Sequence, residues 1–359
     1  MNDEVLRLAV DARDLPTDTR GIGRYARAIL RRLVDRPDVE LTLLAHGLFP
    51  ARHRAKMRAA LRSDRFRVAS SAGGCSLLWH PANGMFFNGH APSVVTIHDA
   101  VPFRFPHVEP KHRDREQAPF LRSVRRASYF ITVSNFARDE LAQVFSLDAS
   151  RVAVVYHGVD PTFSPGATLT HVPDDLRAQP YFLFVGDTSG LEPRKNFPLL
   201  YAAHRRAFDE EGPPLVVVGP NDPHLDGVRY AGEARGDASG AGDEFLRDFY
   251  CGALALCVPS YHETFGMPMI EAMACGTPVV ACAASCLPEI GGHAALYAEP
   301  HDAQSWSGAL KQIASLPQLR AQLRSKGLEQ ARRYDWNASA TEHVQLFKRV
   351  VRESKARTN

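Results

Sequence analysis

Short apolar runs alternate along most of the chain with longer stretches whose apolar residues recur at helical spacing. Such runs are typical of strands in a parallel sheet, because helices cover both faces of that sheet. We expect strands at 6–10, 41–45, 94–97, 130–133 and 152–156 in the first half, and at 181–185, 215–218, 254–258 and 279–282 in the second half. The alternation predicts an α/β protein with two doubly wound parallel sheets.

A proline-rich and weakly patterned segment at 161–180 separates the two halves. A chain of 359 residues is also long for a single core. We predict Rossmann-like domains at 1–165 and 166–335, and a helical segment at 336–359 that packs back toward the first domain and frays at 353–359. Ligands of such sheets bind beyond the carboxyl ends of the strands, so we expect a central cleft lined by the loops that follow the strands.

Composition narrows the class of protein. With 45% hydrophobic and 23% charged residues the chain is a folded globular protein. Most of its six cysteines lie among apolar or small residues, which favours buried free thiols and a cytoplasmic location. No apolar segment is long enough to span a bilayer and no signal-peptide pattern occurs, so any membrane contact should be peripheral, at the inner face.

The first candidate segment contains Gly21 and Gly23, followed by a helical stripe that includes Tyr25 and Ile29. Glycines ahead of a helix let the backbone approach a phosphate. With Ala26 the segment also fits a dinucleotide fingerprint, but a long loop separates it from the preceding strand and no acidic residue follows the next strand. A ligand loop and a plain helix start both remain open here.

Two further candidates follow predicted strands directly. His98 comes immediately after 94–97, where a strand end would point into a cleft, although a histidine there can also be purely structural. Arg194 and Lys195 follow 181–185 and precede a helix that Asn196 can cap and Pro198 can begin. Two cations at a helix start favour an anion site, and a solvated loop is the alternative.

The most specific segment is 263–280. It places Glu263 in a loop, Gly266 and Pro268 at a helix start, and Glu271 in the first turns of that helix. Each glutamate can accept hydrogen bonds from sugar hydroxyls, from two depths of one site. Stabilisation of the helix dipole is the alternative role, but it does not explain the glycine-bearing loop between the two glutamates.

This segment resembles the glutamate, seven residues, glutamate motif of the retaining glycosyltransferase family 4, whose members have the GT-B fold. Further matches to the family occur in the family's order at 21–25, 97–99, 134–136, 157–160, 192–196 and 287–289. The resemblance therefore covers nearly the whole chain and implies a hexosyltransferase with two Rossmann-like domains.

The resemblance implies a role for each matching residue of the second domain. Glu271 would bind the donor ribose, and Glu263 would contact the transferred sugar near its reacting face. Lys195, with Arg194, would neutralise the diphosphate leaving group, so neither a metal nor another cofactor is expected. The backbone amides of a short segment would meet sugar and phosphate, and this donor-binding segment comprises Phe265, Gly266, Met267 and Pro268.

In the first domain, Gly21 and Gly23 would form a glycine loop against donor phosphate or acceptor, and His98 would bind the donor sugar. His98 and Glu263 are therefore the expected catalytic residues, in a reaction that resembles a front-face displacement with retention. The chain departs from the family pattern at Asp187, where many relatives have an arginine, and Arg194 is the expected substitute.

The motifs at 21–25 and 192–196 are similar to those of bacterial mannosyltransferases that use GDP-sugars in polysaccharide and O-antigen assembly. They imply GDP-mannose as the donor and a saccharide or lipid-linked saccharide as the acceptor, while UDP-sugars and dTDP-rhamnose remain open. A basic segment from Arg52 to Arg67 could lie on an anionic membrane or be a solvated helix. We expect no nucleic-acid partner.

Three other classes of protein remain as alternatives. An epimerase or phosphorylase would share the twin-sheet fold, but its sequence pattern does not accompany these motifs. A catalytically silent nucleotide-sugar scaffold would be favoured by loss of Glu263, Glu271 or Lys195, and all three are present. A nicotinamide oxidoreductase is the third alternative.

Overall fold

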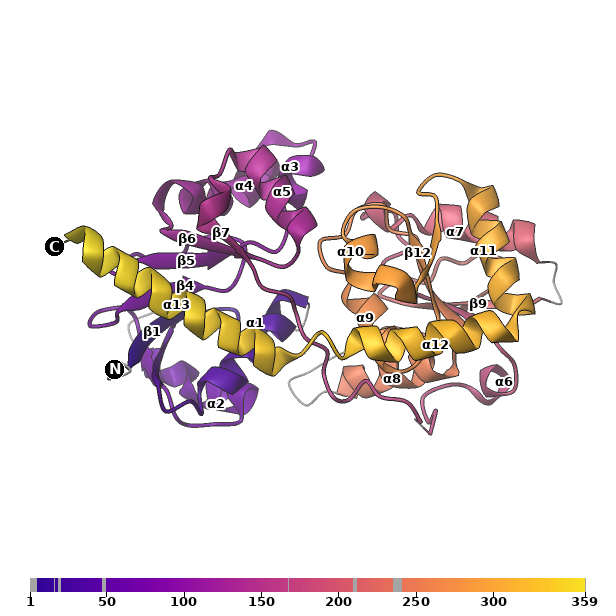
Figure 1. The fold of residues 1–359 in the computed structure, drawn as a ribbon, viewed down its shortest axis with the longest axis horizontal. Helices are drawn as coiled ribbons and strands as arrows, with labels where there is room; N and C mark the ends of the chain where they lie inside the picture. The colour runs from indigo at the N-terminus through magenta and orange to yellow at the C-terminus, as the bar shows by residue number, and fades with distance from the viewer. Residues whose placement is uncertain are drawn as a thin grey trace. The chain divides into compact units, whose positions relative to one another are not determined.

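The computed structural model describes residues 5–15, 17–18, 21–46, 50–166, 168–208, 212–234 and 241–358. The chain forms two compact units (Figure 1). Unit 1 comprises Met1–Gly158 and Trp336–Asn359, and unit 2 comprises Val159–Asp335. The division thus falls a few residues before 165, and the C-terminal segment belongs to unit 1.

The described part of unit 1 contains a parallel sheet of seven strands in the order β3-β2-β1-β4-β5-β6-β7. The strands are β1 Leu6–Asp11, β2 Val39–Leu44, β3 Arg67–Ala69, β4 Leu77–His80, β5 Ser93–Thr96, β6 Tyr129–Thr132 and β7 Val152–Val154. The helices are α1 Gly21–Leu33, α2 Arg54–Leu61, α3 Val101–Arg104, α4 Pro110–Arg126, α5 Asn135–Phe145 and α13 Trp336–Thr358.

Helix α13 joins unit 1 by packing on α1, as Figure 1 shows. Tyr25 and Ile29 on the predicted stripe of α1 are buried, which confirms the helical spacing of that segment. The predicted fraying at the C-terminus is wrong for most of the tail, because α13 continues to Thr358.

The described part of unit 2 contains six parallel strands in the order β10-β9-β8-β11-β12-β13. The strands are β8 Phe182–Val185, β9 Leu215–Val218, β10 Val228–Tyr230, β11 Ala255–Val258, β12 Val279–Cys282 and β13 Leu296–Ala298. The helices are α6 Asp174–Arg177, α7 Phe197–Ala207, α8 Ala241–Gly252, α9 Met267–Ala274, α10 Leu287–Gly291, α11 Ala303–Ser315 and α12 Pro317–Ala331.

The two parallel sheets confirm the predicted fold class, and each predicted strand is present within a few residues. Strands β3, β4, β10 and β13 were not predicted. Three of them, β3, β10 and β13, are three-residue strands at sheet edges, where one side is partly exposed and no apolar run is needed. Four of the six cysteines are buried and all are free, as expected. None of the described helices is long and apolar enough to cross a membrane.

Candidate active site

In unit 2, loops from three neighbouring strands meet beyond their carboxyl ends. Arg194 and Lys195 lie on the loop that follows β8, Glu263 follows β11, and Ser285 follows β12. Strands β8, β11 and β12 are adjacent in the sheet, so the topology brings these side chains together. This is the edge of a parallel sheet at which ligands bind.

The centre of this site is an ion pair. Lys195 Nζ donates to Glu263 Oε1 at 2.6 Å, and a guanidinium nitrogen of Arg194 lies 3.6 Å from Oε2 of the same carboxylate. The backbone N–H of Glu263 donates to Ser285 Oγ at 3.0 Å. Burial by itself would raise the pKa of Glu263, but Lys195 and Arg194 hold that pKa below its usual value. Glu263 is therefore a carboxylate at neutral pH.

Arg194 is held in the site by further contacts. Its guanidinium donates to Glu192 Oε2 at 3.1 Å and to the carbonyl oxygen of His262 at 3.3 Å. Its own carbonyl accepts from the backbone N–H of Tyr261 at 3.1 Å. The cationic loop is thus fixed to the loop that carries Glu263.

Asn196 supports the same loop in a way that differs from the prediction. It occupies the N-cap position of α7, but its side chain makes no capping bond. Instead its Nδ2 donates to the carbonyl oxygens of Pro259 at 3.3 Å and Pro300 at 3.0 Å, and its backbone is left-handed with φ +56°. The side chain ties the β8 loop to two other loops rather than capping a helix.

Gly266 sets the start of α9. Its φ is +81°, and a Cβ placed there would lie 2.9 Å from Leu287 Cδ2, so only glycine fits without displacement. Phe265 is buried and meets the ring of Tyr334 edge-on at 5.6 Å. Met267 and Pro268 form the first turn, as predicted for Pro268. The N-terminus of α9, which favours anions, thus follows directly on the loop that carries Glu263.

Glu271 lies deeper than Glu263. Only 1% of its surface is exposed, and its Oε2 accepts from the hydroxyl of Tyr250 at 3.1 Å. The side chain of Glu263 is 13% exposed. The two glutamates therefore occupy two depths along the same loop and helix, as the sequence predicted.

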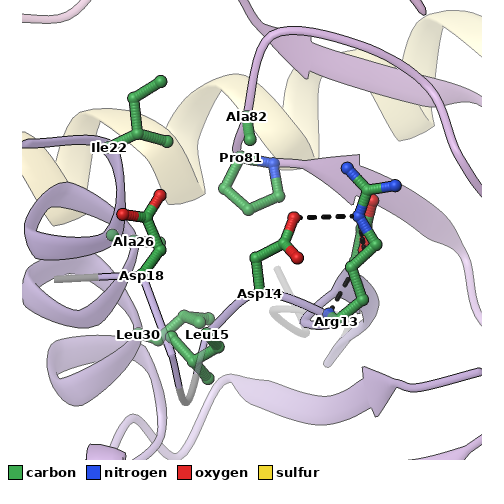
Figure 2. Close-up of a pocket in the computed structure, with 11 residues that line it drawn as sticks. Arg13, Asp14, Leu15, Asp18, Ile22, Ala26, Leu30, Pro81 and Ala82 are labelled. Carbon is green, nitrogen blue, oxygen red and sulfur yellow. Dashed lines mark hydrogen bonds and ion pairs between the residues drawn. The ribbon is translucent and has the colours of Figure 1, made fainter. Parts of the chain in front are cut away.

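In unit 1 the segment from Gly21 to Gly23 is the first turn of α1, so the predicted loop is wrong at these residues. A Cβ on Gly23 would overlap the backbone oxygen of Asp18, whereas Gly21 has no neighbour within 4 Å of such an atom. Beside this turn lies a small pocket of about 30 Å³ (Figure 2). Its lining includes Asp14, whose carboxylate accepts from Arg13 Nε at 3.0 Å.

His98 follows β5 and is buried. Its Nε2 lies 2.8 Å from the carbonyl oxygen of Pro81, and its backbone N–H donates to Asn83 Oδ1 at 2.6 Å. Burial holds the pKa of His98 below its usual value, so the ring is neutral at neutral pH. Because a carbonyl only accepts, Nε2 carries the proton and Nδ1 keeps a lone pair that can accept from a hydroxyl.

The structure therefore groups the predicted residues into two sets, one in each unit. Arg194, Lys195 and Glu263 are in direct contact in unit 2, while Gly21, Gly23 and His98 belong to unit 1. Sequence reasoning missed the residues that contact these sets. Ser285 and Tyr250 bond the two glutamates, and Tyr25 packs against His98. Of these residues only Tyr25 stands out in the sequence, because it belongs to an apolar stripe at helical spacing, and such a stripe is also expected of any buried helix face.

A metal could be held by one group of three among the described residues. His107, Glu109 and His112, at the start of α4, each offer a ligand atom within 4.8 Å of the others, and all three are exposed. No such group occurs among the described residues around Lys195 and Glu263. The unit 2 site offers cations and helix amides, both of which favour a bound anion.

Comparison with known families matches both halves of the chain. Residues 13–163 match a family model described as Glycosyltransferase Family 4, and residues 176–330 match one described as Glycosyl transferases group 1. Together with two parallel-sheet Rossmann-like units, these matches define the protein as a glycosyltransferase enzyme with the GT-B fold. Both halves of the chain are therefore those of a glycosyltransferase, and the N-terminal half matches family 4.

Among curated relatives, the O-antigen chain mannosyltransferase B of Escherichia coli is 28% identical over 91% of this chain and 96% of its own length. The O-antigen chain mannosyltransferase RfbU of Salmonella typhimurium is 28% identical over 62% of this chain and 61% of its own. A D-inositol 3-phosphate glycosyltransferase of Stackebrandtia nassauensis is 30% identical, and the match spans 60% of this chain and about half (53%) of that relative.

Solved structures share the fold at low sequence identity. The Anabaena protein HepE, solved with UDP-glucose, superposes with a TM-score of 0.70 at 16% identity and covers 96% of this chain and 99% of its own. WaaG, a glycosyltransferase of lipopolysaccharide biosynthesis, gives a TM-score of 0.65 at 13% identity, with the same coverage. These likenesses confirm the GT-B architecture.

Proposed function

We propose that this enzyme transfers mannose, with retention, from GDP-mannose to a saccharide or lipid-linked saccharide acceptor in polysaccharide or O-antigen assembly, without a metal. The observation that carries the proposal is the match to an O-antigen mannosyltransferase over nearly the full length of both chains. The motifs around Gly21 and Lys195 support the same donor.

The unit 2 site suits a diphosphate leaving group. Lys195 and Arg194 supply two positive charges that now face one carboxylate, and the N-terminus of α9 adds favourable backbone dipoles. A bound diphosphate would compete with Glu263 for these cations and leave that carboxylate to accept from sugar hydroxyls. Fixed cations stabilise the negative charge that develops on the leaving group, which is the task a divalent metal performs in other sites.

His98 suits contact with a sugar hydroxyl. As a neutral imidazole with its proton on Nε2, it can accept a hydrogen bond at Nδ1 and cannot act as a strong acid there. Its proposed role is therefore to hold the donor sugar rather than to protonate a leaving group.

A panel of nucleotide sugars tests the donor and the metal together. Purified protein with excess chelator is given GDP-mannose, UDP-glucose, UDP-N-acetylglucosamine and dTDP-rhamnose, and slow hydrolysis and binding are measured. Glu271→Ala is the site variant, and Glu329→Ala, at an exposed glutamate of α12, is its matched control. We expect turnover of GDP-mannose that Glu271→Ala loses and Glu329→Ala keeps.

Other outcomes of the panel separate the alternatives. Turnover of a UDP-sugar would keep the enzyme class and replace the donor, an outcome for which the UDP-glucose complex of HepE gives a precedent. Turnover only without chelator would contradict metal independence. Binding without turnover under any condition would favour a scaffold. The anomeric configuration of the product, read by NMR, tests retention.

The basic segment Arg52–Arg67 suits peripheral contact with an anionic membrane through charge alone. Its apolar residues Met57, Leu61 and Phe66 are buried, while its cations, including Lys56 and Arg58, are exposed. Such a surface attracts anionic lipid without inserting into it. We expect salt-sensitive sedimentation with anionic vesicles that Lys56→Glu with Arg58→Glu abolishes, and no binding by the native chain would reject the contact.

A further inference from the structure

Unit 1 contains a chain of buried polar side chains that runs through four elements. Trp79 of β4 donates from Nε1 to Thr96 Oγ1 at 3.0 Å, and Thr96 of β5 lies 3.1 Å from the hydroxyl of Tyr25 on α1. That hydroxyl lies 2.6 Å from Nε2 of His343 on α13, whose Nδ1 lies 2.7 Å from the carbonyl oxygen of Ser339. These hydrogen bonds therefore link the sheet to the C-terminal helix through Tyr25.

The backbone carbonyl of Ser339, the last partner in this series of hydrogen bonds, fixes the direction of every bond in the series. The carbonyl of Ser339 can only accept, so His343 donates from Nδ1. Burial lowers the pKa of His343 to about 4, so the ring is neutral at neutral pH and its Nε2 is an acceptor. Tyr25, whose pKa burial raises, therefore donates its hydroxyl proton to His343 and accepts from Thr96. Each buried donor then has one acceptor.

Tyr25 also packs directly against His98. Its ring meets the ring of His98 edge-on, with centroids 4.7 Å apart and planes at 82°. His157 packs on both, with its ring centroid 5.6 Å from that of His98 and 5.0 Å from that of Tyr25. The ring of His98 is thus oriented by its hydrogen bonds to Pro81 and Asn83 in the loop after β4, and by the ring of Tyr25, whose hydroxyl is bonded to α13.

Burial makes this arrangement sensitive to single changes. Tyr25 is 1% exposed, and Thr96 and His343 are fully buried, so water has no ready access to replace a lost partner. A Tyr25 hydroxyl without its acceptor would rotate or shift its ring to find another. Because the ring touches His98, the shift would be passed to the imidazole.

We propose that His343, acting through the Tyr25 hydroxyl, is a positioning residue that holds His98 in its sugar-binding orientation. The proposal rests on the proposed role of His98 in donor binding. It assigns to the C-terminal helix a part in the reaction geometry of unit 1, beyond packing against α1.

NMR of protein labelled with ¹⁵N-histidine tests the hydrogen-bond chain without any substrate. We expect His343 as the Nδ1–H tautomer and His98 as the Nε2–H tautomer at pH 7, and a change in the ring signals of His98 in Tyr25→Phe and His343→Leu. The opposite tautomer at His343, or unchanged His98 signals in both folded variants, would overturn the proposal. These NMR outcomes do not depend on whether the protein turns over GDP-mannose.

Kinetics then tests the consequence for the reaction, with the nucleotide sugar that the native protein hydrolyses. We expect His343→Leu to lower kcat about tenfold with little change in the donor KM, because a displaced group costs turnover more than it costs binding by unit 2. His343→Gln, which keeps an acceptor for Tyr25, should restore most of kcat. His204→Leu is the matched control, since His204 in unit 2 is also a buried histidine bonded to a backbone carbonyl.

The kinetic outcomes distinguish failure of the proposal for His343 from failure of the proposed role of His98. Equal kcat in His343→Leu and His204→Leu would mean that His343 is only structural, which rejects the proposal. Full activity in His98→Ala would mean that the donor does not need His98, which rejects its proposed role instead. Loss of activity in His343→Leu without rescue by His343→Gln, at an unchanged His98 spectrum, would point to general destabilisation and also reject the proposal.

Discussion

Each unit contains a carboxylate held between a lysine and an arginine, and the two clusters differ mainly in where they lie on their sheets. In unit 2, Glu263 contacts Lys195 and Arg194. In unit 1, Asp38 accepts from Arg36 at 2.9 Å and from Lys348 of α13 at 2.9 Å. The lysines are equally shielded, with 20% and 19% of their side chains exposed.

Their places in the sheets separate the proposed binding site around Glu263 from the cluster of Asp38, Arg36 and Lys348, which we call the clasp. Asp38 comes just before β2 begins, whereas Glu263 and Lys195 come after β11 and β8 end. Parallel α/β sheets bind ligands beyond the carboxyl ends of their strands, where loops diverge and helix N-termini gather. Charge composition and burial alone would therefore not identify the site, and the following variants test whether the assignment by position holds.

The largest expected effect is on activity, in the pair Lys195→Met and Lys348→Met. We expect Lys195→Met to lower kcat/KM for the donor by about 100-fold or more, because one fixed charge on the leaving group is lost. Lys348→Met removes the same charge from the clasp and should change kcat/KM less than about threefold. Steady-state kinetics measures both, and comparable losses in the two variants would contradict the assignment.

Acid should weaken unit 1 before it weakens the Glu263 cluster. The pKa of His343 is lowered from 6.5 to about 4 in the folded protein. As the pH falls from about 6.5 to 4, the unfolded chain takes up a proton on this residue while the folded protein does not, so the free energy of unfolding decreases. The shift corresponds to about 3 kcal/mol in the free energy of unfolding. Burial also lowers the pKa values of His98 and His157 in unit 1 and of His204 in unit 2.

Fluorescence can follow unit 1 by itself, because Trp79 and Trp336 lie in unit 1 and Trp306 lies in unit 2. In a Trp306→Phe background, denaturant unfolding should give a lower midpoint at pH 5 than at pH 7, and His343→Leu should reduce that difference. The pKa of Glu263 is held below 4.5, so its contribution is lost only at lower pH. Equal midpoints at pH 7 and pH 5 would show that these histidines do not stay neutral in the folded state.

The sequence predicted the sheets better than it predicted the contacts that orient the site. Strands such as β9 read as apolar runs because both faces are buried, whereas β10 lies at an edge and has no such run. Lys195 and Glu263 belong to recognisable segments, but their pairing depends on β8 lying beside β11. Tyr25 and His343 are 318 positions apart, and nothing in either segment indicates that they meet.

A smaller effect is expected from two glycines that share the same backbone angle. Gly266 and Gly190 both have φ +81°, but a Cβ on Gly266 would meet Leu287 at 2.9 Å while one on Gly190 would meet nothing within 4 Å. We expect Gly190→Ala to cost about 1 kcal/mol of stability and Gly266→Ala about 2 to 3 kcal/mol, with weaker donor binding only in Gly266→Ala. Denaturant unfolding and donor titration measure the two effects, and equal losses would mean that backbone strain alone matters at α9.

The smallest effect is expected from the clasp itself. Arg36 and Lys348 hold the pKa of Asp38 at about 2, but the Asp38 carboxylate keeps both bonds to Arg36 when Lys348 is replaced. Lys348→Met should therefore lower the free energy of unfolding of unit 1 by only about 0.5 to 1 kcal/mol, as for partly exposed ion pairs. Lys355→Met, at an exposed position of the same helix, controls for the change in helix charge. A loss of several kcal/mol in Lys348→Met alone would mean that the clasp, and not the buried chain through His343, is the main attachment of α13 to unit 1.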